Sequence, residues 1–164
     1  PATTTALDVR RIDAEPLDDE AIADTLRNHR ERPLGLGRDG EFRISIAGVQ
    51  EKTALLRRDS RWFRPRGPTP TSHILKLPIG PGANGIDMAD SVENEWLCLR
   101  LAAAFGLPVA NADMHRFVDQ KVLVVERFDR RWAADGSWLM RDHQEDFCQA
   151  LGVPSALKYE ADGG

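Results

Sequence analysis

The sequence has few cysteines, few histidines and no long apolar run, and each scarcity excludes a class of protein. Its 164 residues include only two cysteines, Cys98 and Cys148, at no ligand-like spacing. Neither a disulfide framework nor a zinc site is therefore supported, and we expect a reducing, cytoplasmic location. The four histidines form no metal-ligand spacing. No apolar stretch approaches the roughly 18 residues of a membrane span, and the N-terminus lacks the pattern of a signal peptide, so we expect no membrane partner.

An excess of basic residues is also missing. The 22 Lys and Arg against 26 Asp and Glu give a net charge of −4, which is unlike a dedicated nucleic-acid binder, although a local basic patch stays open. The apolar fraction of 41% suffices for one core. The first residue is Pro1 and the last two are Gly163 and Gly164. We therefore expect a piece of a longer protein.

The N-terminal stretch, residues 1–40, is polar and is expected to be a partial segment with one helix. Leu17, Ala21, Ile22 and Leu26 recur at helical spacing, and Pro16 precedes them at a favourable first-turn position.

Alternating or continuous apolar residues then predict strands at residues 42–46, 53–56, 62–63 and 73–77, and a hairpin over 114–128. A helix is predicted from a cap at Asp90 to Phe105, with Glu93 completing a capping box, and a short helix near 145–151. The order of elements predicts an α+β fold, a mostly antiparallel sheet with one packed helix. We find no internal repeat.

One carboxylate of the predicted helix is expected to point toward the interior. Its apolar face carries Val92, Trp96, Leu99 and Ala103. Glu95 falls at the edge of that face, whereas Glu93 falls on the opposite side. Lys76, on the strand 73–77, could then neutralise nucleotide phosphates if Glu95 held it. Taken alone, Lys76 is more often a surface lysine.

The loop between the strands at 42–46 and 53–56 is small and polar, with one glycine and a lysine. Its backbone N–H groups could point at phosphate oxygens, and Lys52 adds a cation. An ordinary hairpin with a polar tip is the simpler alternative, because neither a P-loop nor a GxGxxG motif is present.

Five arginines surround two aromatic residues, Trp62 and Phe63. They are Arg57, Arg58, Arg61, Arg64 and Arg66. Such a cluster could contact nucleic acid, but a solvated sheet edge is the favoured interpretation, given the acidic total.

Several blocks together resemble the HipA-type serine/threonine-protein kinase toxins of the HipBA toxin–antitoxin family. The blocks are residues 42–56, 71–80, 94–95, 125–132, 144–149 and 158–160, and they occur in family order from about Leu34 to the end. The resemblance implies a kinase-like upper lobe and hinge over residues 41–128 and the start of a helical lower lobe over 129–164, truncated at its end.

By this resemblance the complete protein is an ATP- and Mg²⁺-dependent protein kinase that autophosphorylates, causes growth arrest and persistence, and acts on a protein substrate, for which glutamyl-tRNA synthetase is the expectation. A HipB-like DNA-binding antitoxin is the expected partner, with operator DNA reached through it. The resemblance implies three groups of nucleotide-binding residues. They are a phosphate-binding loop of Ala47, Gly48, Val49, Gln50, Glu51 and Lys52, then Lys76, and an adenine-binding hinge of Glu126, Arg127 and Phe128.

The resemblance also implies that Ser45 is the autophosphorylated residue. A phosphate there adds roughly −1.5 to −2 charge beside the loop that would hold ATP phosphates and should switch the kinase off. The catalytic and metal-binding residues of the family lie beyond Gly164, so none is assigned here and this piece alone is expected to be inactive. The alternative is a non-catalytic or split HipA-like module that binds antitoxin and operator DNA.

Overall fold

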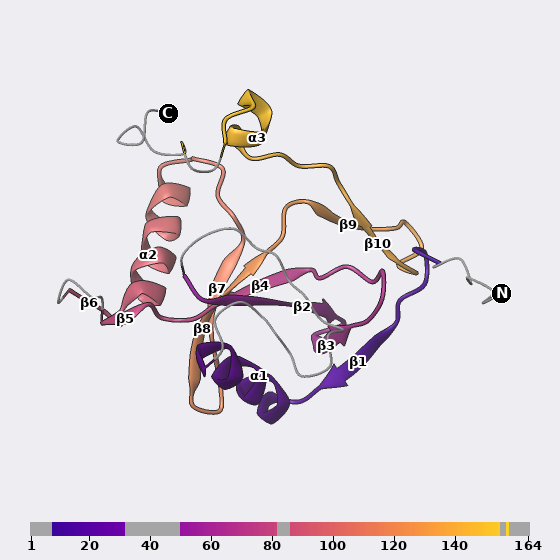
Figure 1. The fold of residues 1–164 in the computed structure, drawn as a ribbon, viewed down its shortest axis with the longest axis horizontal. Coiled ribbons are helices and arrows are strands. Elements are labelled where there is room, and N and C mark those ends of the chain that lie inside the picture. The colour runs from indigo at the N-terminus through magenta and orange to yellow at the C-terminus, as the bar shows by residue number, and fades with distance from the viewer. Residues whose placement is uncertain (1–7, 32–49, 82–85, 155–156, 158–164) are drawn as a thin grey trace.

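A six-stranded antiparallel sheet forms the centre of the structure, a computed structural model that describes residues 8–31, 50–81, 86–154 and 157 (Figure 1). The strand order is β1-β3-β2-β4-β8-β7. The strands are β1 Ala14–Leu17, β2 Lys52–Arg58, β3 Arg61–Pro65, β4 His73–Lys76, β7 Ala112–Phe117 and β8 Gln120–Glu126. This sheet confirms the predicted α+β class, whereas the strand expected over residues 42–46 lies outside the described residues.

Three helices and two small strand pairs complete the described part of the chain. The helices are α1 Asp19–Glu31, α2 Ser91–Ala104 and α3 Phe147–Leu151. The small pairs are β5 Gly80–Pro81 with β6 Asp87–Met88, and β9 Arg130–Trp132 with β10 Leu139–Arg141. Figure 1 shows α2 beside the sheet at β7 and β8, and β9 and β10 away from both α1 and α2.

The hydrophobic core lies between α1 and one face of the sheet. Ile22, Ala23 and Leu26 of α1 are fully buried. They pack in one cluster with sheet residues Leu55, Trp62, Leu75, Leu77, Phe117, Val122 and Val124. Helix α1, which the sequence analysis placed in the N-terminal segment 1–40, thus packs against the core face of the sheet.

Helix α1 begins later than the sequence analysis predicted. Pro16 and Leu17 belong to β1, which pairs with β3 at the edge of the sheet. An edge strand tolerates proline, because the missing N–H costs no ladder hydrogen bond on the open side. Asp18 takes the capping role, since its Oδ1 accepts a hydrogen bond from the Ala21 N–H at 2.8 Å.

Asp90 is the N-cap residue of α2, as predicted, but the predicted capping box is absent. Asp90 precedes the helix but makes no side-chain capping hydrogen bond. The predicted partner Glu93 instead forms an ion pair with Lys121 of β8. The end of α2 is confirmed, because Gly106 follows it with a φ of 78°.

The sequence analysis missed the β9–β10 pair. The Ala133 N–H donates to the Trp138 carbonyl at 2.9 Å, and Gly136 lies in the connecting turn with a φ of 67°. Asp135-Gly136 is a strong turn signal, but the flanking segments are too short and too polar to show strand periodicity. The short helix predicted near 145–151 is confirmed as α3, with a capping box between Asp146 and Gln149. None of the helices within the described ranges is long and apolar enough to cross a membrane.

The burial of α1 predicts that Leu26→Ala lowers the free energy of unfolding by about 2–5 kcal/mol, because it leaves a cavity against the sheet. Urea denaturation of the 164-residue chain measures this value. Leu97→Ala on α2 is the matched control, because the Leu97 side chain is half exposed. Equal losses for the two variants would contradict the assignment of α1 to the core.

Candidate functional site

Lys76 and Glu95 form an ion pair between the sheet and helix α2. The Lys76 Nζ lies 2.5 Å from the Glu95 Oε1. Leu75 of β4 and Leu77, the residue after its end, are fully buried on the core side, so Lys76 leaves the strand on the opposite face. The predicted contact is therefore present, while the role of this pair in holding a nucleotide stays a prediction.

Lys52 places a second cation beside Lys76. The two residues are directly paired across strands β2 and β4, so their side chains leave the same face of the sheet. Like charges in this arrangement repel each other and favour an anion between or above them. Glu95 supplies one negative charge at this place.

The described end of the predicted phosphate loop is fixed beside β4. The Gln50 side chain donates to the Leu77 carbonyl at 2.7 Å, and the Leu77 N–H donates to the Glu51 carbonyl at 3.0 Å. These contacts hold residues 50–52 next to Lys76. The remaining loop residues Ala47, Gly48 and Val49, and also Ser45, lie outside the described residues.

The predicted hinge segment, residues 126–128, follows β8, the neighbour of β4. Glu126 is paired with His73, and Leu123 is paired with Lys76. Three residues of extended strand separate these two pairs, which places the hinge about 10 Å from Lys76 along the sheet. The adenine edge and the α-phosphate of an extended ATP molecule lie a similar distance apart.

Two half-buried apolar residues, Ile74 and Val125, lie between Lys76 and the hinge. They are paired with each other, and Ile74 shares its face of β4 with Lys76. An apolar pair at this position is suited to contact a flat aromatic base.

His73 has a packing role. Its ring lies edge-on against Trp62, with 5.4 Å between the ring centroids. Burial lowers the pKa of His73, and the positive charge of Arg57 lowers it further, although Glu126 opposes both. The imidazole beside the hinge is therefore neutral at neutral pH.

Glu93 does not lie on the side of α2 that faces solvent, contrary to the sequence analysis. Its Oε1 pairs with the Lys121 Nζ at 2.5 Å, and its Oε2 is enclosed without a hydrogen-bond partner among the described residues. The helix lies across β7 and β8, so both Glu93 and Glu95 reach the sheet, at different strands. The hydrogen bond from Lys121 holds the pKa of Glu93 below its usual value.

The arginines of β2 and β3 have partners within the chain. Arg64 and Arg66 pair with Glu15 of β1. Arg57 lies over the Trp62 ring, and Arg58 lies over the Trp132 ring. The basic cluster is thus partly neutralised by Glu15 and partly stacked on aromatic rings.

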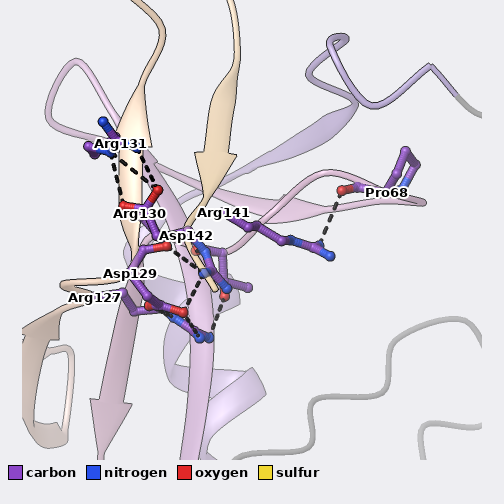
Figure 2. A network of polar contacts seen from close by, with 8 residues as sticks. Pro68, Arg127, Asp129, Arg130, Arg131, Arg141 and Asp142 are labelled. Carbon is purple, nitrogen blue, oxygen red and sulfur yellow. Dashed lines mark hydrogen bonds and ion pairs between the residues drawn. The ribbon is translucent and has the colours of Figure 1, made fainter. Parts of the chain in front are cut away.

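The sequence analysis missed a buried carboxylate directly after residues 126–128. Asp129 is 3% exposed and pairs with both Arg127 and Arg130 (Figure 2). An aspartate between two arginines, directly after a buried strand, is the signal that could have indicated this network. Within the described ranges, no group of three His, Cys, Asp or Glu side chains could hold a metal ion.

The ion pair between Glu93 and Lys121 predicts a small, pH-dependent effect on stability. Lys121→Met should lower the free energy of unfolding by about 0.2–1 kcal/mol. Because the folded-state pKa of Glu93 is lowered, the pair stabilises the chain above the ordinary value of 4.5 and loses this effect as the pH falls below it. The variant should therefore lose less stability than the parent when the pH is lowered through this range in urea denaturation.

Glu93→Gln should show the same reduced pH dependence, because it removes the other partner of the pair. The double variant Glu93→Gln with Lys121→Met should add no further change in pH dependence. If either single variant loses as much free energy of unfolding as the parent when the pH is lowered, the pairing is contradicted.

Comparisons with known proteins identify relatives of this chain. Residues 44–164 match the family described as the HipA-like C-terminal domain. The chain is 44% identical over 151 residues to "Putative kinase Y4mE" of Sinorhizobium fredii, which covers 91% of this chain and 34% of that protein. It is 37% identical over 126 residues to the serine/threonine-protein kinase toxin HipA of Shewanella oneidensis, which covers 77% of this chain and 27% of the toxin.

A solved structure supports the same relationship. HipA of Shewanella oneidensis MR-1, determined in a complex with HipB and operator DNA, matches with a TM-score of 0.71 and 31% sequence identity. The match covers all of this chain and 36% of that one. The chain thus spans about a third of the length of these relatives. It belongs to the HipA-like C-terminal domain family, whose relatives include proteins named as kinases.

Proposed function

We propose that this chain is the ATP-binding portion of a HipA-type serine/threonine protein kinase, the toxin of a bacterial toxin–antitoxin pair. The observation that carries the proposal is the Lys76–Glu95 ion pair on β4, beside the strand that leads into the hinge. A strand lysine held by a helix glutamate is the arrangement with which protein kinases hold nucleotide phosphates. The relatives named as kinases agree with this chemistry.

Each part of ATP then has a binding place on the described face of the sheet. The α- and β-phosphates lie at Lys76 and Lys52. The loop residues 47–52, of which 47–49 lie outside the described residues, are expected to offer their N–H groups to the phosphates. The base lies over Ile74 and Val125. Its edge meets the backbone of residues 126–128.

Glu95 positions Lys76 rather than reacting itself. Both side chains are only partly exposed, and their ion pair fixes the ammonium group of Lys76 above the sheet. Phosphoryl transfer depends mainly on such positioning and on neutralising the charge of the phosphates. Mg²⁺ would neutralise further phosphate charge when bound, and its ligands are expected in the part of the relatives that this chain does not span, as is the catalytic base.

The proposed partners follow from the relatives. The Shewanella oneidensis HipA structure contains HipB and operator DNA, so we propose a HipB-like antitoxin as partner, with DNA reached through it. A protein substrate, with glutamyl-tRNA synthetase as the first candidate, and growth arrest as the outcome of its phosphorylation belong to the same proposal. Autophosphorylation of Ser45, which lies outside the described residues, stays a prediction that the mass of the purified protein tests.

The alternative of a non-catalytic module that binds DNA directly gains no specific support. Four of the five clustered arginines contact Glu15 or an aromatic ring of the same chain. The ion pairs with Glu15 offset part of the positive charge that a phosphate backbone would meet, and stacking on the aromatic rings engages Arg57 and Arg58.

The proposal predicts that Lys76→Ala weakens ATP binding by roughly tenfold or more, because a charge-assisted contact to phosphate is lost. Titration calorimetry with ATP and Mg²⁺ should be done on the 164-residue chain and on the complete reading frame side by side. Glu95→Gln should weaken binding less, because Lys76 stays but is no longer held by a charge.

Lys121→Ala is the matched control, because it also removes a lysine paired with a glutamate of α2, but from β8 instead of β4. It should leave the affinity for ATP unchanged. ATP binding that survives Lys76→Ala in the complete protein would contradict the proposed site. Binding by the complete protein but not by the 164-residue chain would show that the remaining part of the protein completes the site.

A further inference from the structure

The backbone beyond β8 is wrapped around the buried carboxylate of Asp129. The Arg127 guanidinium donates to both Asp129 oxygens, at 3.0 Å and 2.9 Å. Arg130 donates to the Asp129 Oδ2 at 2.5 Å and to the Asp129 carbonyl at 2.9 Å. Asp129 therefore joins the residue directly before Phe128 to a residue two positions after it (Figure 2).

The same network anchors this segment to the chain that enters β4. The Arg130 Nε donates to the Thr71 carbonyl at 2.9 Å, and the Arg127 N–H donates to the Ser72 carbonyl at 2.9 Å. On the other side, the Asp142 N–H donates to the Asp129 carbonyl at 2.9 Å. The position of Asp129 is thus fixed from the residues just before β4, from its own segment and from the residue that follows β10.

Phe128 lies between Arg127 and Asp129 but makes none of the hydrogen bonds of this network. Its side chain is 83% exposed. The N–H groups of Glu126 and Arg127 are engaged with the carbonyls of Asn111 and Ser72, but the Phe128 N–H and carbonyl have no hydrogen-bond partner among the described residues. Within the hinge segment, Phe128 therefore offers both a free donor and a free acceptor.

The charge of Asp129 is maintained in this buried place. Burial raises the pKa of its carboxyl group, but the hydrogen bonds and positive charges of Arg127 and Arg130 outweigh burial and hold the pKa below the usual value. A neutral amide would give up this arrangement, because its NH₂ group would face a guanidinium donor.

We infer that Asp129 is a positioning residue that fixes the hinge so that the free N–H and carbonyl of Phe128 face the edge of the adenine base. This inference rests on the proposed ATP-binding function. It assigns Asp129 to the base and not to the phosphates. The hinge begins at Glu126, which is paired with His73, and Lys76 lies three residues after His73 on β4, at the other end of the site.

The test compares two ligands, ATP and inorganic tripolyphosphate, which has the phosphate groups but no base. Binding of each is measured by titration calorimetry on the complete reading frame, for the parent protein and for Asp129→Asn. The variant should weaken ATP binding by roughly tenfold and leave tripolyphosphate binding unchanged, because only the contacts to the base depend on the hinge.

Asp142→Asn is the matched control. The Asp142 side chain makes a similar two-oxygen pair, but with Arg131, and the substitution keeps the Asp142 backbone N–H that donates to the Asp129 carbonyl. It should leave the binding of both ligands unchanged. If Asp129→Asn does not fold, as circular dichroism would show, Arg130→Gln decides by the same comparison, because it keeps the Arg127–Asp129 pair and loses the anchor to Thr71.

The outcomes separate this inference from the function on which it rests. A parent protein that does not bind ATP, or binds it no better than tripolyphosphate, contradicts an adenine site at the hinge and overturns both proposals. A parent that binds ATP better, with a variant that binds it equally well, overturns the role of Asp129 alone. An equal loss for both ligands shows a general structural role and also overturns it.

Discussion

Strand β4 is hydrogen-bonded to β2 on one side and to β8 on the other, and this double pairing sets the geometry of the candidate site. The side chains of β4 point alternately to the two faces of the sheet, and this alternation determines the direction of Lys76. Leu75 and Leu77 are fully buried in the core beside α1, so Lys76 must leave the strand on the other face. A slip of one residue would move Lys76 into the core and expose both leucines, which the hydrophobic effect opposes. The position of the charged group is therefore fixed by its apolar neighbours.

Helix α2 adds what the sheet cannot provide, a negative charge held at a fixed distance from Lys76. The pair itself contributes little to stability, because both side chains are partly exposed and such pairs are worth about 0–1 kcal/mol. Glu93 holds the first turn of the same helix to β8 through Lys121, at a different strand. Two contacts at separate strands restrict the rotation of α2 more than either does alone. The arrangement is thus better explained by positioning than by stabilisation.

The sequence predicted those parts of the site that depend on local periodicity. Alternation around Lys76 and helical spacing around Glu95 were sufficient, because each residue lies in a regular element with a clear apolar face. The start of α1 was wrong, since Pro16 suits a first helical turn and an edge strand equally well, and only the pairing of β1 with β3 decides between them. Glu93 was misplaced because the helical wheel assumes one flat contact face, whereas α2 lies across two strands. Asp129 was missed because its burial depends on Thr71 and Arg130, which periodicity does not bring together.

The two ends of the candidate site are held by different physical interactions. At Lys76, apolar burial sets the direction of the side chain, and this constraint is insensitive to charge. At the hinge, Asp129 and its two arginines set the backbone, and apolar packing contributes little because the Phe128 ring lies in solvent. A buried carboxylate with two guanidinium partners is costly to break, because each remaining charge would lack a partner. The strand register therefore sets the distance between the two ends, while the ion pairs set the orientation of the hinge. A ligand that meets both ends must match a length fixed by the first constraint and a hydrogen-bond pattern fixed by the second.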